Sequence, residues 1–250
     1  MGQSANQFYQ TVSRFYDQMT GFEKRLHKEK EIMQKWVERY RCKTALDAAC
    51  GTGLHTIVLN QLGITATGAD LSREMLQQAR QNSEALGLSI AWLDVPMQDL
   101  SDHTDQEVDI LFCLGNSIPH LLSTEELERT FSGFRKLVRP VGILAIQILN
   151  YENILKNAER IVGIKKAGGH TFVRFYDFLQ NTIRFNILSI EEDEKGLHHT
   201  LSSTELYPYR WQELQSFLDK AGFHTFELYG DMLFSEYHPD HSSNLVIVAY

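Results

Sequence analysis

The segment at residues 44–53, TALDAACGTG, limits the possible folds of this chain more than any other stretch. Residues 44–49 are mostly apolar, which is typical of a short strand that is covered on both faces. Gly51 and Gly53 allow backbone angles and a close ligand approach that a Cβ would prevent. A helix beginning near Leu54 would point its unpaired N–H groups at this turn. The segment therefore predicts a buried strand, a glycine turn and a helix N-terminus that faces a ligand.

Two aspartates stand where such a turn uses carboxylates. Asp47 lies at the carboxyl end of the predicted strand, and Asp70 ends an apolar run nineteen residues after Gly51. In nucleotide-binding α/β folds, an acid with the spacing of Asp70 accepts hydrogen bonds from ribose hydroxyls. A dinucleotide fold would also need a third glycine near Thr56. A turn that only connects a strand to a helix is the weaker alternative, since it would not explain either aspartate.

This arrangement resembles motif I and the following acidic strand end of class I S-adenosylmethionine (SAM) methyltransferases. Their pattern, hydrophobic-Leu-Asp-x-x-Cys-Gly-Thr-Gly, is matched at residues 45–53. The resemblance implies SAM as the methyl donor and S-adenosylhomocysteine as the product.

The remaining pattern predicts alternating helices and strands and then an antiparallel segment. Residues 6–40 have helical periodicity that is broken at Gly21, and Ser72 is a good N-cap for the helix after Asp70. A capping box at Ser123 to Glu126 opens a further helix that runs to about Val138. We expect core strands at 88–93, 108–114 and, after a turn at 140–142, 143–149; period-2 strands at 171–179, 182–190 and 199–207; a helix at 211–221; and last strands at 223–229 and 245–250.

The predicted fold is α/β. It has a Rossmann-like, seven-stranded, mostly parallel sheet with helices on both faces, and an antiparallel β insertion after the fifth strand that covers the carboxyl edge of the sheet. We divide the chain into an N-terminal helical cap (1–40), a SAM-binding core (41–150), an insertion or lid (151–207), and a C-terminal helix with the last two strands (208–250).

The composition of the chain limits the kinds of binding partner that we expect. The formal charge of -8, from 32 acidic and 24 basic residues, and the lack of a basic run argue against nucleic acid. We expect no membrane span, no signal peptide and a cytoplasmic location. The three cysteines have neither paired nor metal-type spacing, and a homo-oligomer is left open. The histidines at 198–199 and at 238 and 241 fall in predicted turns, so we expect no metal site.

Residues at the carboxyl ends of the predicted strands are the expected cofactor contacts. We expect Asp70 to hold the ribose, Trp92 and Leu93 to face the adenine, and Leu114 and Gly115 to offer carbonyls to the methionine ammonium. Core packing is an equal alternative for Trp92. The full expected set is Tyr9, Asp47, Ala49, Gly51, Gly53, Asp70, Leu71, Met75, Trp92, Leu93, Asp94, Leu114 and Gly115.

A second segment narrows the resemblance. Residues 110–121, ILFCLGNSIPHL, resemble the Cys-Leu-Gly-Asn-Ser-x-x-His-Leu segment of glycine and sarcosine N-methyltransferases. The pairs Trp92-Leu93 and Asn150-Tyr151 also resemble residues of that group. This resemblance implies that Asn116 and His120 lie near the reacting centre. We place them with Tyr16 in the catalytic group, although a capping or core hydrogen bond is an equal alternative for His120.

The acceptor side departs from that family. Its members place an arginine before the Asn-Tyr pair, where it pairs with the substrate carboxylate, and this chain has Leu149. Leucine cannot form that bidentate pair, so we expect poor activity on glycine and a wall that favours an uncharged or apolar group. Arg174 or Arg184 in the insertion would be another source of charge. The expected substrate contacts are Leu149, Tyr151, Arg174 and Tyr176.

The predicted function is methyl transfer from SAM to a small-molecule acceptor, preferably at nitrogen, by in-line displacement. Alignment and desolvation supply most of the acceleration, and a base is needed only if the acceptor binds protonated. O- or S-methylation is the alternative within this class. A non-catalytic SAM-binding module and a nicotinamide-dependent oxidoreductase are the alternatives from other classes.

Overall fold

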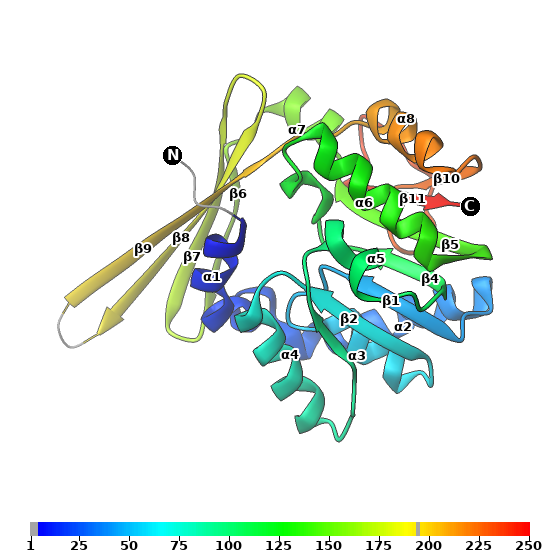
Figure 1. Ribbon diagram of the computed structural model, residues 1–250. Coiled ribbons are helices and arrows are strands. Elements are labelled where there is room, and N and C mark those ends of the chain that lie inside the picture. The colour runs from blue at the N-terminus through cyan, green and yellow to red at the C-terminus, as the bar shows by residue number, and fades with distance from the viewer. Residues whose placement is uncertain (1–4, 194–195) are drawn as a thin grey trace.

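The computed structural model describes residues 5–193 and 196–250, which form two sheets and the helices around them (Figure 1). The larger sheet has seven strands in the order β10-β11-β5-β4-β1-β2-β3. The strands from β5 through β4, β1 and β2 to β3 are parallel, while β11 runs antiparallel to β5 and β10. The strands are β1 (Thr44–Ala48), β2 (Thr65–Asp70), β3 (Trp92–Asp94), β4 (Val108–Cys113), β5 (Val138–Leu149), β10 (Phe226–Tyr229) and β11 (Asn244–Ala249).

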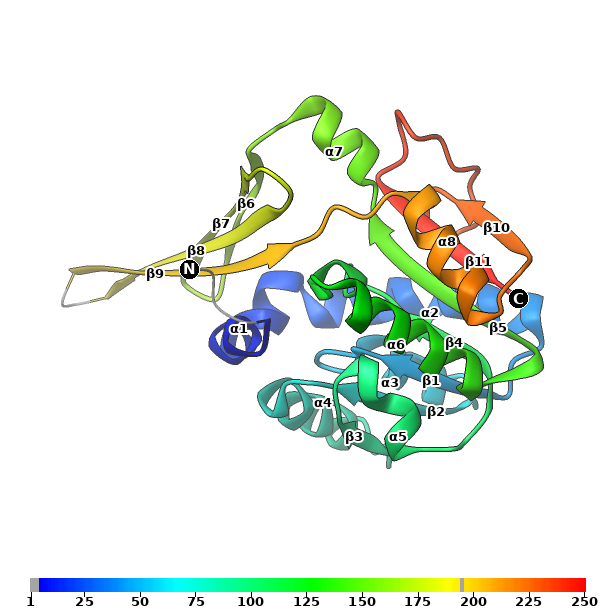
Figure 2. The ribbon, with the colours of Figure 1, turned by 45° about the horizontal axis from the view of Figure 1, so that its top comes forward.

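Helices cover both faces of this sheet because the strands are apolar on both sides. On one face, α6 (Thr124–Leu137) and α8 (Trp211–Ala221) pack through Phe131, Phe134 and Leu218, and Figure 2 shows these two helices side by side. On the other face, α2 (Phe22–Tyr40) and α3 (Leu54–Gln61) pack through Trp36 and Leu59. Further helices are α4 (Arg73–Ala85), α5 (Leu100–His103) and α7 (Tyr151–Asn157), and there are 3-10 turns at Met97–Asp99 and Ile118–His120.

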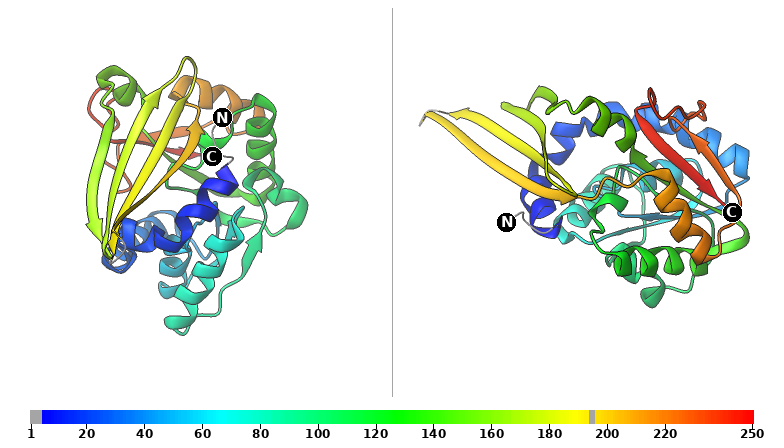
Figure 3. Two further views of the ribbon diagram at one scale, coloured as in Figure 1. Left: turned by 90° about the vertical axis from the view of Figure 1, so that its left-hand side faces the viewer. Right: turned by 90° about the horizontal axis from the view of Figure 1, so that it is seen from above.

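The smaller sheet is antiparallel and lies between β5 and α8 in the sequence. Its strands, in spatial order, are β6 (Ile161–Ala167), β7 (His170–Phe178), β8 (Ile183–Asp193) and β9 (Gly196–Leu206). Helix α1 (Ala5–Thr20) lies against it, and Phe8, Phe15 and Met19 share a buried cluster with Phe172 and Ile187. Figure 3 shows the sheet crossing over α1 at one end of the larger sheet. The predicted fold class, with its antiparallel insertion, is confirmed.

Several predicted elements have the expected ends because local signals set them. Gly21 separates α1 from α2 with φ 78, and Gly222 ends α8 with φ 99. The hydroxyl of Ser72 accepts from the Met75 N–H, and the capping box at Ser123 is complete.

Other boundaries differ from the prediction. The third strand begins at Trp92 instead of residue 88, and Leu88 and Ile90 pack against a small cluster near α3. The fifth strand begins at Val138, directly after α6, so residues 140–142 form no turn; the ladder with β4 is irregular there. Strand β6 and helix α7 were not expected, since β6 is an exposed edge strand without clear alternation.

The order of the strands places the ligand-binding edge. β1 pairs with both β2 and β4, so the strand order reverses at β1. Crevices form at the carboxyl ends of strands where the order reverses, which puts the glycine turn after β1 and the segment after β4 on either side of one. Among the helices of the described residues, none is long and apolar enough to cross a membrane.

Gly68 and the ring of Trp92 are in close contact beside the glycine turn that follows β1. A Cβ added to Gly68 would lie 2.5 Å from the Trp92 ring and 2.9 Å from Cys50 Sγ. We expect Gly68→Ala to lower the free energy of unfolding by about 1–3 kcal/mol through overpacking, measured by denaturant titration. In a Trp92→Leu background the same change should cost less. An equal cost in both backgrounds would contradict the contact.

Candidate active site

The glycine turn has a left-handed backbone that the neighbouring aspartate holds in place. Ala49, Gly51 and Gly53 have φ values of 59, 57 and 84. The carboxylate of Asp70, at the end of β2, accepts from the Gly51 N–H at 2.8 Å and the Ser72 N–H at 2.9 Å. Burial raises the pKa of Asp70 to about 6, against the lowering effect of these two donors.

Asp47 is buried behind this turn and is hydrogen-bonded by Thr56. Its side chain is 1% exposed, and Oδ2 accepts from the Thr56 hydroxyl at 2.8 Å. Burial raises the pKa of this carboxyl, although nearby His55 opposes the shift. Two carboxyl groups therefore border the turn from the ends of adjacent strands.

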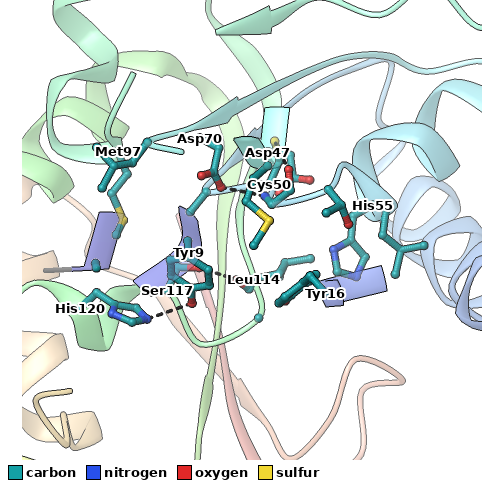
Figure 4. Close-up of a pocket in the computed structure, with 18 of the residues that line it drawn as sticks. Tyr9, Tyr16, Asp47, Cys50, His55, Asp70, Met97, Leu114, Ser117 and His120 are labelled. Atoms are coloured by element: carbon teal, nitrogen blue, oxygen red, sulfur yellow. Dashed lines mark hydrogen bonds between the residues drawn. The ribbon is translucent and has the colours of Figure 1, made fainter. Parts of the chain in front are cut away.

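A cavity opens above the turn, between the carboxyl ends of β1, β2 and β4 and helix α1, and we name it the turn cavity (Figure 4). Its wall includes eleven of the residues that the sequence predicted for cofactor or catalytic contacts: Tyr9, Tyr16, Asp47, Ala49, Gly51, Asp70, Leu71, Met75, Leu114, Gly115 and His120.

Other residues of this wall were not predicted. Arg25 and His55 approach from α2 and α3, and both lie near Glu29, with N···O distances of 3.3 and 3.5 Å. The i,i+4 spacing of Arg25 and Glu29 indicates an ion pair on a helix but not the cavity beside it. Met97 and Ser117 contribute to the wall from the segments after β3 and β4.

Four predicted cofactor contacts, Gly53, Trp92, Leu93 and Asp94, do not line the turn cavity. The ring of Trp92 lies against Gly53 and Gly68, where added Cβ atoms would come within 2.5 Å of it. Leu93 packs against the main core, and Asp94 pairs with Arg73 at 2.6 Å on the surface. Trp92 thus occupies the packing position that the sequence left open, and it covers Gly53 as well.

A second cavity lies between the insertion sheet and the end of β5, and we name it the insertion cavity. Tyr9, Tyr16, Thr20, Gly115 and His120 line both cavities, so the two meet along helix α1 and the segment after β4. The residues that line the insertion cavity alone are Phe8, Met19, Asn116, Gln147, Leu149, Val162, Arg174, Tyr176, Phe185, Ile187 and Leu206.

Helix α1 is fixed over the turn through one aspartate. Asp17 accepts from the Thr52 hydroxyl at 2.6 Å and from Asn82 Nδ2 of α4 at 2.9 Å. These bonds position Tyr9 and Tyr16, which line both cavities; Figure 4 shows the two tyrosines at the turn cavity.

His120 and Tyr9 form a neutral pair at this junction. The Tyr9 hydroxyl and His120 Nε2 are 3.0 Å apart, and the Thr204 hydroxyl is 3.5 Å from Nδ1. Burial lowers the pKa of His120 to about 4 and raises the pKa of Tyr9. The imidazole is therefore uncharged at neutral pH.

The side chain of Asn116 forms hydrogen bonds within the protein. This residue has φ 75, its Nδ2 donates to the Tyr151 hydroxyl at 2.9 Å, and its Oδ1 accepts from the Leu149 N–H at 2.9 Å. Tyr151 is 1% exposed and does not line either cavity described here. Asn116 thus joins the segment after β4 to the end of β5, and its place in the catalytic group stays a prediction.

The two arginines of the insertion have different surroundings. Arg174 lines the insertion cavity, whereas Arg184 pairs with Glu205 at 3.4 Å and does not line it. Among the described residues, no group of three or more His, Cys, Asp or Glu side chains has an arrangement suited to a metal ion. Metal-independent activity stays a prediction.

Comparison with known proteins agrees with this geometry. A family model of a methyltransferase domain matches residues 45–142. The chain is 26% identical over 246 residues to the glycine/sarcosine N-methyltransferase of Aphanothece halophytica, across 98% of this chain and 89% of that protein. It is 27% identical over 229 residues to the glycine/sarcosine/dimethylglycine N-methyltransferase of Actinopolyspora halophila, across 90% of this chain but 39% of that protein.

A solved structure, the SAM-dependent methyltransferase from Clostridium acetobutylicum, has the same fold, with a TM-score of 0.81, 15% identity and coverage of 96% of this chain and 98% of that one. This likeness shows the fold alone. The domain match and the similarity to curated methyltransferases define the class: the chain is a SAM-dependent methyltransferase, and its cofactor is SAM. Within this class it is similar to the glycine and sarcosine N-methyltransferases.

The His120 imidazole should resist protonation, and this can be measured directly. We expect its NMR titration in the folded protein to have a midpoint near 4, because burial disfavours the imidazolium. Since the unfolded chain binds this proton below about 6.5, His120 should lower stability as the pH falls from about 6.5 toward 4. A midpoint near 6.5 in the folded protein would contradict the assigned burial.

Proposed function

We propose that this enzyme transfers the methyl group of SAM to a nitrogen atom of a small-molecule acceptor, with SAM in the turn cavity and the acceptor in the insertion cavity. The observation that carries the proposal is the junction of the two cavities at Tyr9, Tyr16, Gly115 and His120. In-line displacement needs donor and acceptor to approach each other from opposite sides of one opening. The similarity to N-methyltransferases supports nitrogen as the methylated atom.

The turn cavity has the groups that SAM requires. Asp70 is a buried carboxylate whose present donors are two backbone N–H groups, and ribose hydroxyls would add the hydrogen bonds that stabilise its charge. Leu71, Met75 and Met97 form an apolar part of the wall for the adenine. Asp47 and Arg25 supply opposite charges for the ammonium and carboxylate of the methionine part. SAM itself supplies an activated methyl group on a sulfonium.

The junction residues orient the acceptor and do not act as a strong base. A histidine with a pKa of about 4 is a poor proton acceptor for an amine at neutral pH. Its hydrogen bond with Tyr9 instead fixes the hydroxyl and ring of that tyrosine at the opening. Burial in the insertion cavity would keep the acceptor amine neutral by the same desolvation that keeps His120 neutral. The proton released after transfer then goes to solvent.

The direct test is a screen of small amines, acids, thiols and phenols for release of S-adenosylhomocysteine. Turnover confined to amines would support the proposal. Turnover of phenols, acids or thiols alone would replace nitrogen by oxygen or sulfur, and SAM binding without turnover of any acceptor would favour a binding module.

Asp70 should control SAM affinity in a pH-dependent way. We expect Asp70→Ala to weaken SAM binding by about 1–3 kcal/mol in calorimetry, the range for lost hydrogen bonds to a charged group. The ionised carboxylate is the better acceptor, and Asp47 and Asp94 add to its raised pKa, so affinity should fall as the pH is lowered through about 6. Asp70→Asn should remove this dependence, whereas Asp94→Asn at the surface should keep it. Unchanged SAM affinity in Asp70→Ala would refute the ribose assignment.

Leu149 should make glycine a poor acceptor. It lines the insertion cavity at the end of β5 and cannot pair with a carboxylate there. We expect a low kcat/KM for glycine and sarcosine relative to neutral amines that fit the apolar wall, and a gain for glycine in Leu149→Arg. Efficient glycine turnover by the unmodified enzyme would rule out this account of the wall.

A further inference from the structure

Arg174 is a half-buried cation with apolar neighbours on the inner face of the insertion sheet. On β7 it lies between Phe172 and Tyr176 on the same face, and both of these are buried. Its ladder partner on β8 is Ile187, which is also buried. This is the face that packs on α1 and lines the insertion cavity. A charged side chain at such a position is costly unless something compensates its charge.

The described residues supply no such compensation. Apart from Arg174, the wall of the insertion cavity contains no Asp, Glu, Lys or Arg. The other arginines of the insertion differ in this respect, since Arg160 pairs with Asp177, and Arg184 with Glu205. For Arg174, no carboxylate within ion-pair distance is found in residues 5–193 and 196–250. Burial raises the pKa of Tyr16 and of Tyr176, and the charge of Arg174 opposes both shifts.

A glycine beside Arg174 makes room for the guanidinium. Gly163 is the ladder partner of Arg174 on β6, and a Cβ added there would lie 3.3 Å from Arg174 Nη2. Glycine weakens a strand interior and often marks a place where another group must approach closely. The strand thus accommodates the guanidinium beside the cavity at some cost to its own stability.

We propose that Arg174 binds a carboxylate of the acceptor, so that the substrate class is an amine that carries one carboxylate and an apolar body larger than that of glycine. This inference rests on the proposed function, because it takes the insertion cavity as the acceptor site. One guanidinium provides a bidentate fork that matches one carboxylate, whereas a phosphate dianion would call for further cations that this wall lacks. Val162, Phe185 and Leu206 surround the remaining space with apolar surface.

This assignment agrees with the leucine at the end of β5. Leu149 and Arg174 both line the insertion cavity, one from the large sheet and one from the insertion. The carboxylate therefore binds on the insertion side, while Leu149 contacts an apolar part of the acceptor. In the reaction the amine lone pair forms the new N–C bond, the S–CH₃ bond breaks with its electrons going to sulfur, and the amine then loses a proton to water.

A binding experiment tests the carboxylate site without requiring turnover. The S-adenosylhomocysteine complex is titrated in a calorimeter with phenylacetate and with its uncharged analogue phenylacetamide. We expect phenylacetate to bind about 10- to 100-fold more tightly, which is the range for a charged hydrogen-bonded pair. Arg174→Met should remove this preference, and Arg174→Lys should restore part of it. Arg184→Met is the matched control, since it removes a cation from the same sheet outside the cavity.

Equal affinity for the two probes, absence of phenylacetate binding, or equal losses in Arg174→Met and Arg184→Met would overturn the assignment. A turnover comparison then separates it from the proposed function. With phenylalanine and phenethylamine as acceptors, Arg174→Met should raise KM about 10- to 100-fold for the amino acid alone. If no amine is methylated while phenylacetate binding still depends on Arg174, nitrogen transfer fails and the carboxylate site stands.

Discussion

The hydrogen bond from the Gly51 N–H to the Asp70 carboxylate connects the two strand ends on which the whole site depends. It fixes the left-handed turn after β1 against the end of β2 at 2.8 Å, next to the position where the strand order reverses. The same carboxylate faces the turn cavity, so one side chain both shapes the turn and lines the site. Its raised pKa shows the cost of holding a charge there before ligand hydroxyls arrive.

Helix α1 turns this nucleotide-type crevice into a two-sided site. Asp17 binds it to the glycine turn and to α4, while its apolar face packs on the insertion sheet. The helix therefore contacts both parts of the site and contributes the two tyrosines at their junction. The insertion sheet alone would leave the acceptor side open, and the large sheet alone would bind a cofactor without enclosing an acceptor.

The sequence predicted features that local chemistry determines. The glycine turn, the spacing of Asp70, the Ser72 cap and the capping box at Ser123 depend on a few adjacent residues, and the structure has them all. The alternation of elements was enough to predict the seven-stranded sheet and its antiparallel insertion.

Features set by distant contacts were not readable from the sequence. Trp92 covers the glycines because β3 lies beside β2, and Asn116 is held by Leu149 and Tyr151 from another strand. Arg25 and His55 reach the cavity through the packing of α2 and α3, for which a one-dimensional pattern gives no signal. The distinction between Arg174 and Arg184 likewise follows from the register of the insertion sheet, which places them on opposite faces.

The most direct measurement is a crystal structure of the protein with S-adenosylhomocysteine. We expect the ribose hydroxyls to lie on Asp70 and the sulfur to lie at the junction lined by Tyr9, Tyr16 and His120, with the side that carried the methyl group facing the insertion cavity. A ligand bound elsewhere, or a sulfur directed away from the insertion cavity, would contradict the two-cavity arrangement on which the proposed reaction rests.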